Sequence, residues 1–432
     1  MSLIHKKKEK EEMSFEKFAL HEKIFAGVRA QGYTTPTPIQ LQSIPPIMEG
    51  RDVMGLAQTG TGKTAAFVLP ILQRLMQGPH RHVRALIIAP TRELSEQTNE
   101  VIGQLGRRTQ LNSASIYGGV SINRQIKKLN DHVDIISACP GRLLDHINRG
   151  TVDLSHVEVL VLDEADHMFD MGFLPDIRRI VGRLPKKRQT LLFSATMPED
   201  IQRLANDLLQ NPLQIRIGRT APVETVSHRF YPVLMDTKTD LLKDLLDHTE
   251  RESVLVFTRT KSRAKSVAGR LDKSGYKVIS LHGNLTQQKR QKALAGFRDG
   301  RYEIMVATDI AARGIDVTNI SHVINYDMPE TADAYTHRIG RTGRASRTGE
   351  AFTFVTNQDA GLAYSLKKSL GDKVAYHSVD GLTVAVPAEP VSRSGRNHSA
   401  KGMKTQGGNG RSFSPKTHGK RPFKPASRRS WS

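Results

Sequence analysis

Short apolar runs of strand length recur along the first half of the chain, and longer stretches with helical spacing separate them. The runs are rich in Val, Ile and Leu without polar alternation, which is typical of strands buried on both faces of a parallel sheet. They are ALIIAP (85–90), VDIISA (133–138), VEVLVLDEAD (157–166) and TLLFSAT (190–196). We therefore expect an α/β domain over residues 14–215, with a parallel sheet flanked by helices.

The same alternation restarts after a polar stretch, residues 216–228, which we expect to be a linker. The new runs are SVLVFTRT (253–260), KVISLHG (277–283), EIMVATD (303–309), HVINYD (322–327) and EAFTFVT (350–356). They predict a second parallel sheet flanked by helices over residues 229–378. The order of strand, polar loop and helix is similar in the two halves, but no sequence repeat of fixed period links them. The sequence therefore predicts two copies of one architecture without a repeated sequence unit.

The two ends of the chain differ in composition from the domains between them. Residues 1–13 form a charged N-terminal extension. Residues 379–432 form a basic tail that we expect to be disordered, because it cannot bury enough apolar surface to fold. Three aromatic residues stand among its Lys and Arg residues: Phe413, Phe423 and Trp431. This composition favours nonspecific RNA binding through phosphate contacts and base stacking, and the alternative is a solubilising tail with no specific partner.

The 432 residues include 64 Lys and Arg against 43 Asp and Glu, a formal charge of +21 that favours polyanionic partners such as nucleic acid or an acidic membrane surface. Cys139 is the only cysteine, so no intrachain disulfide or Cys-rich zinc site can form, and a reducing compartment is expected. The N-terminus lacks the apolar core of a signal peptide, and no run approaches the roughly 18 apolar residues of a membrane-spanning helix. We expect a soluble, monomeric, cytoplasmic protein without membrane association.

A glycine-rich segment joins a strand-like run, DVMGLA (52–57), to an apolar helical pattern. Glycines let backbone N–H groups turn toward a β-phosphate, Lys63 supplies a charge for the β- and γ-phosphate oxygens, and the Thr64 hydroxyl suits Mg²⁺. The generic pattern has Gly where this chain has Ala57, and the alternative is a glycine-rich turn that binds no phosphate. A dinucleotide fold is disfavoured because the lysine follows the glycines directly. The predicted nucleotide-binding residues are Ala57, Gln58, Thr59, Gly60, Thr61, Gly62, Lys63 and Thr64.

Two carboxylates follow the apolar run VEVLVL (157–162), at the carboxyl end of a predicted strand, where ligands bind in open α/β sheets. Asp163 is expected to hold Mg²⁺ together with Thr64, partly through water. Glu164 is expected to orient or deprotonate the water that attacks the γ-phosphate. Taken alone, an acidic pair after a strand is more often a solvated loop. The phosphate-binding segment upstream favours the catalytic interpretation.

The sequence Asp163-Glu164-Ala165-Asp166 resembles the motif that gives the DEAD-box helicases of superfamily 2 their name. Segments similar to the family's other motifs occur in order from Phe15 to about Thr356. The resemblance implies an ATP-dependent RNA helicase with two tandem RecA-like domains, and ATP and Mg²⁺ as cofactors. The compact core, short N-terminus and basic tail are most similar to the bacterial RhlE type. That type implies ribosome assembly or RNA turnover, with ribosomal particles or RNA-decay proteins as partners.

The segment GYTTPTPIQ (32–40) resembles the family's Q motif. The resemblance implies that Gln40 contacts the adenine edge and that Phe15 helps to pack the site, so that ATP is preferred over GTP. An amide has both a donor and an acceptor for the N6 and N7 atoms of adenine. The tripeptide Ser194-Ala195-Thr196 resembles the SAT motif, which implies that Ser194, Thr196 and Asp166 couple the nucleotide site to strand separation.

The segment HRIGRTGR (337–344) resembles the family's arginine motif. The resemblance implies that Arg341 and Arg344 contact the γ-phosphate across the cleft between the domains and that His337 faces the acidic motif. It also implies that Asp316 accepts a hydrogen bond from the ribose. The alternative for this basic run is a solvated or RNA-binding surface. Because the phosphate-binding lysine belongs to the other domain, a complete ATP site is expected only when the domains close.

Loops in both halves resemble the family's RNA-contacting motifs, whose amides, hydroxyls and arginines bind phosphates without recognising bases. The implied RNA-binding residues are Pro90, Thr91, Arg92, Gly118, Gly119, Pro140, Gly141 and Arg142 in the first domain and Arg259, Gln287, Arg290 and Thr308 in the second. Cys139 stands where the family usually has Thr, so a weak thiol donor replaces a good hydroxyl donor. A weaker or redox-sensitive hold on RNA follows, and the alternative is a buried, inert cysteine.

Three functions are compatible with these motifs. The favoured one is a helicase that opens short RNA duplexes, or remodels RNA–protein complexes, by ATP-driven closure of the domains on single-stranded RNA, with hydrolysis for release. The second is an ATP-locked RNA clamp or annealing factor, which would carry the same motifs and which the basic tail supports as a second activity. The third is a DNA helicase or remodeller, against which the Q motif and the DEAD spelling argue.

Overall fold

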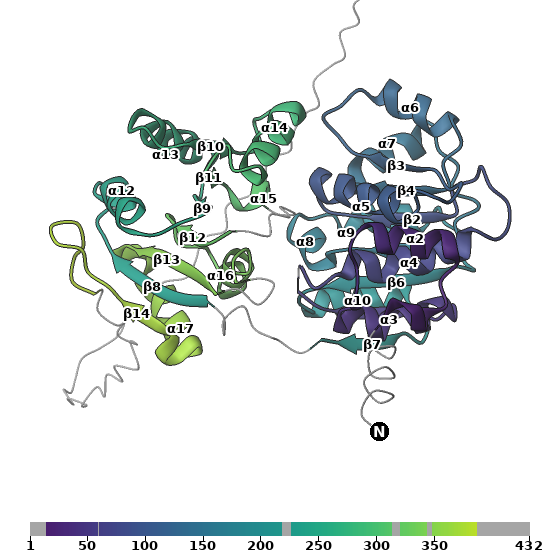
Figure 1. Ribbon diagram of the computed structural model, residues 1–432, viewed down its shortest axis with the longest axis horizontal. Helices are drawn as coiled ribbons and strands as arrows, with labels where there is room; N and C mark the ends of the chain where they lie inside the picture. Colours follow the sequence, from purple (N-terminus) through teal and green to yellow (C-terminus); the bar gives the residue numbers. More distant parts are fainter. Residues whose placement is uncertain (1–13, 59, 218–225, 313–319, 344–347, 387–432) are drawn as a thin grey trace, which may run out of the picture. The chain divides into compact units, whose positions relative to one another are not determined.

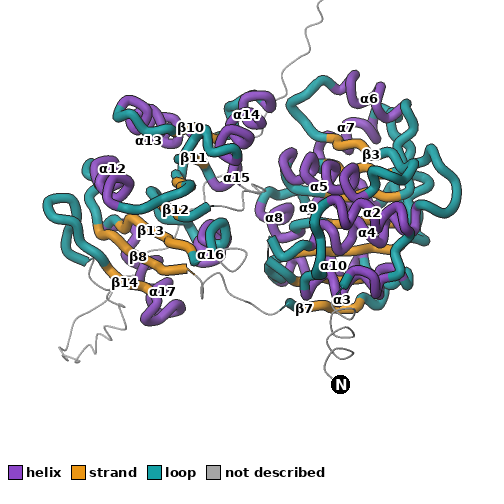
Figure 2. The backbone as a smooth tube through the Cα atoms, in the orientation of Figure 1, coloured by secondary structure: helices purple, strands orange, loops and turns teal. Residues whose placement is uncertain are grey.

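Two parallel sheets follow one another along the chain, each with helices on both faces (Figures 1 and 2). The predicted fold class is therefore confirmed. Three predicted site residues, Thr59, Asp316 and Arg344, lie outside the described residues, as do the N-terminal extension and most of the basic tail. The computed structural model describes five stretches of the chain: residues 14–58, 60–217, 226–312, 320–343 and 348–386.

The first sheet consists of β1 (Val53–Leu56), β2 (Ala85–Ile88), β3 (Ser113–Ile116), β4 (Ile135–Ala138), β5 (Val159–Leu162), β6 (Gln189–Ser194) and β7 (Leu213–Arg216). Their order across the sheet is β3-β4-β2-β5-β6-β1-β7, and all neighbours are parallel. In β5, Val159 and Val161 face one apolar cluster, whereas Leu160 and Leu162 face another. Such alternation on a strand buried on both sides explains why the sequence is continuously apolar there.

Two groups of helices cover the first sheet. One face carries η1 (Phe15–Phe18), α2 (Glu22–Ala30), α3 (Pro38–Met48), α4 (Lys63–Leu75) and α5 (Arg92–Leu105). The other face carries α7 (Pro140–Asn148), α8 (Ala165–Asp170), α9 (Leu174–Val181) and α10 (Glu199–Leu208). The remaining helix, α6 (Ile122–Asn130), buries only Gln125. Prolines open α3 and α7, where their fixed φ suits the first helical position.

The second sheet consists of β8 (Val226–Pro232), β9 (Val254–Phe257), β10 (Val278–Leu281), β11 (Ile304–Ala307), β12 (His322–Asn325), β13 (Gly349–Val355) and β14 (Val374–Tyr376). One face carries α12 (Lys238–His248) and α13 (Lys261–Lys273). The other carries α14 (Gln287–Arg298), α15 (Asp309–Ala312), α16 (Ala332–Ile339) and α17 (Ala360–Leu370). Two short 3-10 helices, η2 (Asn357–Asp359) and η3 (Gly371–Lys373), flank α17.

The two sheets have the same topology. The second has the order β10-β11-β9-β12-β13-β8-β14, which is the order of the first sheet with each strand replaced by the one seven places later. β8 therefore corresponds to β1, β12 to β5 and β9 to β2. The predicted duplication of architecture is present although the sequence carries no periodic repeat.

The boundaries of the second domain differ from the expected ones. β8 begins at Val226, inside the stretch expected to be a linker. After β14 the chain folds back, because Val384 N donates to Pro232 O at 2.9 Å and Thr383 bridges to Val233. Val379 and Leu382 pack on the apolar cluster under α12, so at least residues 379–384 belong with the sheet rather than with the tail. None of the described helices has the length and hydrophobicity needed to span a membrane.

Candidate nucleotide and RNA sites

The loop between β1 and α4 takes a shape that only glycines adopt readily. Gly60 and Gly62 have φ values of 83° and 92°, and a Cβ on Gly62 would lie 2.6 Å from the Gln40 side-chain nitrogen. Lys63 opens α4, and its ammonium group donates to Ala57 O at 2.9 Å. The turn therefore folds tightly around the lysine, and its amides and ammonium lie where a nucleotide phosphate is expected.

Gln40 connects the predicted adenine side of the site to this loop. Its Oε1 accepts from Thr37 N at 2.9 Å, and its Nε2 donates to Gly62 O at 3.1 Å. Both polar atoms of the amide thus already hold backbone groups. Phe15, in η1, is buried and stacks on Tyr33 with ring centroids 6.1 Å apart. The Q-motif residues therefore form the wall behind the phosphate-binding loop.

The carboxylates of the acidic motif lie at the end of β5, and both are buried. Burial raises the pKa of Asp163 to about 6, against the positive charge of Lys63. Burial also works to raise the pKa of Glu164, but His167 and nearby cations outweigh it and lower that pKa to about 2. Glu164 sits in the left-handed region at φ 53°, which is uncommon for a residue other than glycine and occurs at functional sites.

His167 is a site residue that the motif analysis did not single out. Its Nδ1 lies 2.7 Å from Glu164 Oε2, and its ring meets the ring of His337 edge to face, with centroids 5.0 Å apart. The spacing of three residues from Glu164 at the start of a helix could have indicated this contact, because such residues are neighbours on the helix surface. His337, expected to face the acidic motif, thus contacts its helix, and burial lowers the pKa of His337.

Asp166 joins the acidic motif to the SAT segment. Its Oδ2 accepts from Ala195 N at 3.1 Å, from Thr196 N at 2.9 Å and from Thr196 Oγ1 at 3.1 Å. In return, Ser194 Oγ accepts from Asp166 N at 3.2 Å. The residues predicted to couple the two motifs therefore form one partly buried hydrogen-bonded network.

The arginine motif extends from α16. Arg341 is buried, and its positive charge contributes to the low pKa of Glu164. Arg338, which sequence reasoning gave no role, makes a bidentate pair with Asp309 at 2.6 Å for both hydrogen bonds and also donates to Asp327 O at 2.7 Å. Arg338 therefore holds the motif in place, while Arg341 lies toward the acidic motif.

The donor set suits Mg²⁺ bound together with a nucleotide. Mg²⁺ typically takes one or two carboxylates and completes its shell with phosphate oxygens and water. Asp163 supplies one buried carboxylate whose charge is poorly solvated, and Thr64 is the second residue of α4, directly after Lys63. No group of three or more His, Cys, Asp or Glu residues in the described stretches could hold a metal alone. The residues present therefore fit a metal that arrives with phosphate.

The predicted RNA loops of the first domain come together at the ends of β2, β3 and β4. Thr91 caps α5 by accepting from Leu94 N, and a Cβ on Gly119 would overlap the guanidinium of Arg92. Arg142 donates to Val120 O at 3.1 Å and to Gln125 Oε1 at 3.0 Å. Arg142 is thus already committed to protein partners, and it supports the loop that contains Gly118 and Gly119.

Cys139 precedes Pro140 and Gly141 at the start of α7 and is buried. Burial, with Glu93 adding to it, raises the pKa of the Cys139 thiol to about 12. The thiol therefore stays protonated at neutral pH, and a thiolate is the reactive form. The structure favours the inert alternative over redox sensitivity.

The predicted RNA residues of the second domain have two kinds of surroundings. Arg259, half exposed, follows β9, and Thr308 follows β11. Gln287 and Arg290 are buried instead, and they bond to carboxylates of α5 in the first domain. Arg290 Nε lies 2.7 Å from Glu93 Oε1, and Gln287 Nε2 lies 3.4 Å from Glu96 Oε2. The donors that were expected to bind RNA phosphates therefore bond to carboxylates of the protein and do not face solvent.

Comparisons with known proteins agree with this geometry. Residues 37–204 match the DEAD/DEAH box helicase family, and residues 237–346 match the helicase conserved C-terminal domain. The chain is 44% identical over 357 residues to the ATP-dependent RNA helicase CshA of Limosilactobacillus reuteri, covering 82% of this chain and 72% of the relative. It is 46% identical over 348 residues to CshA of Listeria monocytogenes, covering 80% and 67%. The chain therefore belongs to the DEAD-box helicase family.

A solved structure supports the same assignment. Dbp5 of S. cerevisiae, bound to RNA and ADP BeF3, matches with a TM-score of 0.76 at 32% identity over 84% of this chain and 95% of that one. The curated relatives are named CshA and not RhlE, so the expected RhlE type finds no support among them.

Proposed function

We propose that the chain is an RNA-dependent ATPase that unwinds short RNA duplexes or remodels RNA–protein complexes. The observation that carries the proposal is the position of the acidic motif. The positive charge of Lys63 acts to lower the pKa of Asp163. Asp166 accepts hydrogen bonds from the SAT segment, and the ring of His167 contacts that of His337 in the arginine motif. The acidic motif and the first turn of α8 thus interact with the phosphate-binding lysine, the SAT segment and the arginine motif.

Each residue of the nucleotide site would have a separate role in ATP hydrolysis. Lys63 would release Ala57 O to contact the β- and γ-phosphate oxygens, as its position at the helix start allows. Glu164, whose low pKa keeps it ionised, would accept the proton of the attacking water, with His167 fixing the carboxylate. Arg341 would add positive charge where the transition state develops negative charge. Mg²⁺, when bound through Asp163 and Thr64, would neutralise phosphate charge.

RNA binding is proposed to depend on a second contact between the domains, the ion pair of Arg290 with Glu93. The Arg290–Glu93 pair is buried and joins α14 to α5, which Thr91 caps. When this pair holds α14 against α5, the predicted RNA loops next to these two helices are held close to each other. RNA and ATP would therefore each favour the same closed arrangement, consistent with ligand-driven closure.

The test is the steady-state ATPase rate with and without single-stranded RNA. Strong stimulation by RNA, lost in Glu164→Gln and kept in the exposed control Glu100→Gln, is expected. A chain ending at residue 386, which keeps the packed segment after β14, should need more RNA for half-maximal stimulation if the tail captures substrate. Absent stimulation, or equal stimulation by DNA, would reduce the assignment to a generic nucleic-acid-dependent ATPase.

Finer features remain proposals. We assign the type by the CshA relatives rather than by RhlE. We also propose to move the domain boundaries from the expected 14–215 and 229–378 to 14–216 and 226–384. Ribosomal particles or RNA-decay proteins as partners, the monomeric state and the cytoplasmic location stay predictions.

A further inference from the structure

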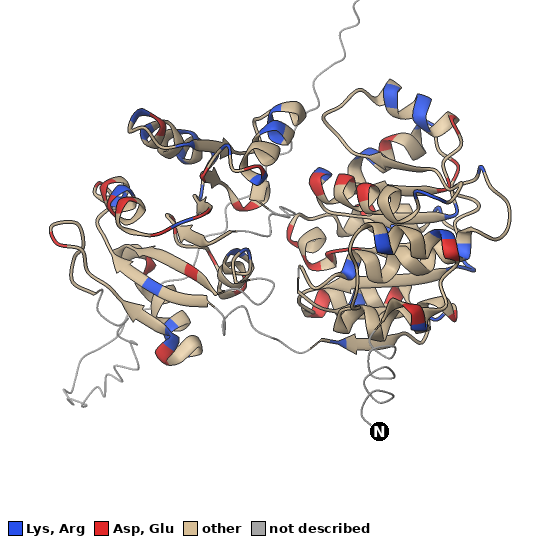
Figure 3. Cartoon of the chain, viewed as in Figure 1, with Lys and Arg blue, Asp and Glu red and all other residues tan. Residues whose placement is uncertain are grey.

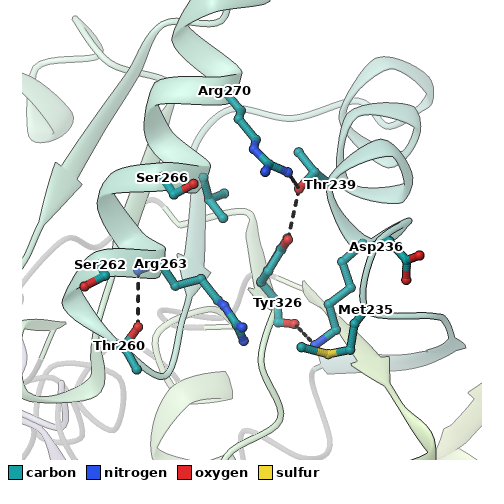
Figure 4. Close-up of a pocket in the computed structure, with 11 residues that line it drawn as sticks. Met235, Asp236, Thr239, Thr260, Ser262, Arg263, Ser266, Arg270 and Tyr326 are labelled. Atoms are coloured by element: carbon teal, nitrogen blue, oxygen red, sulfur yellow. Dashed lines mark hydrogen bonds between the residues drawn. The ribbon is translucent and has the colours of Figure 1, made fainter.

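The second domain contains a cavity of about 500 Å³ that none of the family motifs explains. It lies between α12 and α13, beside Tyr326 at the carboxyl end of β12 (Figure 4). Its lining shares no residue with the smaller pocket around Arg341 and His337. It also contains none of the predicted RNA-binding residues of this domain. The cavity is therefore separate from the sites described above.

The cavity occupies the place that the phosphate-binding loop has in the first domain. β8 corresponds to β1 in the sheet order, and the helices that follow both strands begin with the same pair, Lys63-Thr64 in α4 and Lys238-Thr239 in α12. Asp163 follows β5, and Asp327 lies just beyond β12, its counterpart. Lys238 and Asp327 are 3.2 Å apart. Similar positions in the two domains therefore carry a lysine, a threonine and an aspartate, with Asp327 one residue further from its strand than Asp163.

The loop before α12 cannot wrap a polyphosphate as the first one can. Residues 233–237 contain no glycine, and none of them has a positive φ. Lys238 is buried and already bonds to Tyr326 O at 2.8 Å and to Asp327. A ligand here must therefore be held mainly by side chains, and it would present a single phosphate group rather than a chain of three.

The side chains that could hold it come from one face of α13. Arg263, Ser266 and Arg270 are spaced three and four residues apart, so they lie in line along the helix and border the cavity (Figure 4). Figure 3 shows the concentration of Lys and Arg on α13. Arg263 Nη1 donates to Asp327 Oδ1 at 2.8 Å, and Arg270 Nη1 donates to Thr239 Oγ1 at 3.2 Å. Each guanidinium has five N–H donors, so donors remain on both for a further acceptor.

Charge and size both favour a phosphate-bearing small molecule. Lys238, Arg263 and Arg270 line the cavity. Two carboxylates oppose these three cations: Asp236 in the lining, and Asp327, which pairs with Lys238 and Arg263. Arginine forks and hydroxyls suit phosphate oxygens. The volume lies within the ~300–1,000 Å³ range of small-molecule sites. Met235, which is 48% exposed at the rim, offers an apolar surface for the rest of the ligand.

We propose that this cavity binds the phosphate group of a small ligand, either a nucleoside monophosphate or free inorganic phosphate. The proposal is independent of the helicase activity, because no residue of the ATP site or of the predicted RNA loops takes part. The second domain would thus keep a phosphate site at the position where the first domain binds ATP.

Equilibrium dialysis of the full chain with radiolabelled inorganic phosphate tests the proposal, at constant ionic strength set with chloride. The Lys63→Ala background removes binding at the ATP site. About one saturable phosphate per chain is expected there. Arg270→Gln, at an exposed position, should weaken binding about tenfold or more, since a lost charge-assisted bond is worth at least one such factor. Ser266→Asp, also exposed, should weaken it as well, because the new carboxylate repels a phosphate group. Lys273→Gln, exposed on the same helix, should leave it unchanged.

Two further arms decide the source of the phosphate and guard against a misfolded background. AMP that displaces phosphate and binds more tightly would identify a nucleotide ligand, and AMP that binds no better would identify free phosphate. In the unmodified chain, hydrogen exchange should slow in segments 234–242 and 260–272 when phosphate replaces chloride. Binding that is absent in the Lys63→Ala chain, or that Arg270→Gln and Ser266→Asp leave intact, overturns the proposal. Unchanged hydrogen exchange in both segments overturns it as well.

Discussion

Replacing Asp166 by Asn should separate ATP binding from RNA unwinding. The buried carboxylate accepts three hydrogen bonds from the SAT segment on one oxygen and a fourth, from His167 N at 3.0 Å, on the other. Burial works to raise the pKa of Asp166, but His167, Lys63 and the Thr196 amide outweigh it and lower that pKa, so the group is ionised. An amide of the same shape has only one oxygen and cannot serve both sets of donors.

The expected loss follows from these contacts. If the Asn oxygen turns to the SAT segment, the three bonds lose their charge assistance and His167 N loses its acceptor. If it turns to His167, three donors lose theirs. Bonds to a charged acceptor contribute about 1.5–3 kcal/mol each and are not additive, so we expect a loss of about 3 kcal/mol in the free energy of unfolding of the first domain. For a domain of this size the melting temperature should fall by roughly 6–12 °C.

Calorimetry and unwinding assays together check the reasoning. The Asp166→Asn chain should bind ATP within about threefold of the unmodified affinity, because the hydrogen bonds of the Asp166 carboxylate go to the SAT segment and to His167 N rather than to the loop around Lys63. Duplex unwinding should fall at least tenfold. Asp176→Asn is the matched control, since it removes only a surface contact with Arg179 and should change the unfolding free energy by under about 0.5 kcal/mol. A melting temperature within 2 °C of the original, or unwinding at the original rate, would refute the network as the coupling element.

Three other substitutions test separate parts of the structure. Gln40→Ala should weaken ATP binding about tenfold and reduce its preference over GTP, measured by nucleotide titration, because the amide also holds Gly62 O. Burial lowers the pKa of His146, so the unfolded chain binds more protons as pH falls below about 6.5 and stability is lost there; His146→Gln should flatten this loss in urea unfolding at pH 7.5 and 5.5. Arg290→Gln leaves Glu93 buried without its cation and should cut RNA stimulation of the ATPase at least tenfold, whereas stimulation that survives would remove this pair from the RNA response.

The sequence predicted the central strands well and the marginal ones poorly. Strands such as β5 are buried on both faces, so their apolar composition is continuous and visible. β3, SASI, alternates buried with partly exposed positions, and β7 and β14 at the sheet edges bury little. β8 alternates as well, since its outer residues include Ser227, which is exposed. These four strands were absent from the predicted runs because hydrophobic content is the signal and they have little of it.

Motif chemistry predicted which residues share one edge of the sheet, but it could not assign partners across the chain. The spacing of Lys63 and Asp163 from their strands predicted which edge of the sheet they share. The pairs Arg290–Glu93 and Arg338–Asp309 join residues far apart or on separate elements, and no local pattern encodes them. Arg290 was therefore predicted to bind an RNA phosphate, and Arg338 was given no role. In the structure each arginine pairs with a carboxylate instead.

The two sheets show why a common topology does not give a common function. Strand order alone would place a nucleotide site at β1 and again at β8, and the lysine that begins the following helix occurs at both. The difference lies in the connecting loops. In the first, glycines with positive φ let the backbone close around a phosphate chain, and Gly62 leaves room only because it lacks a Cβ. In the second, five residues without glycine leave Lys238 bonded to Asp327, so the same fold positions the cation but supplies no backbone cradle for a triphosphate.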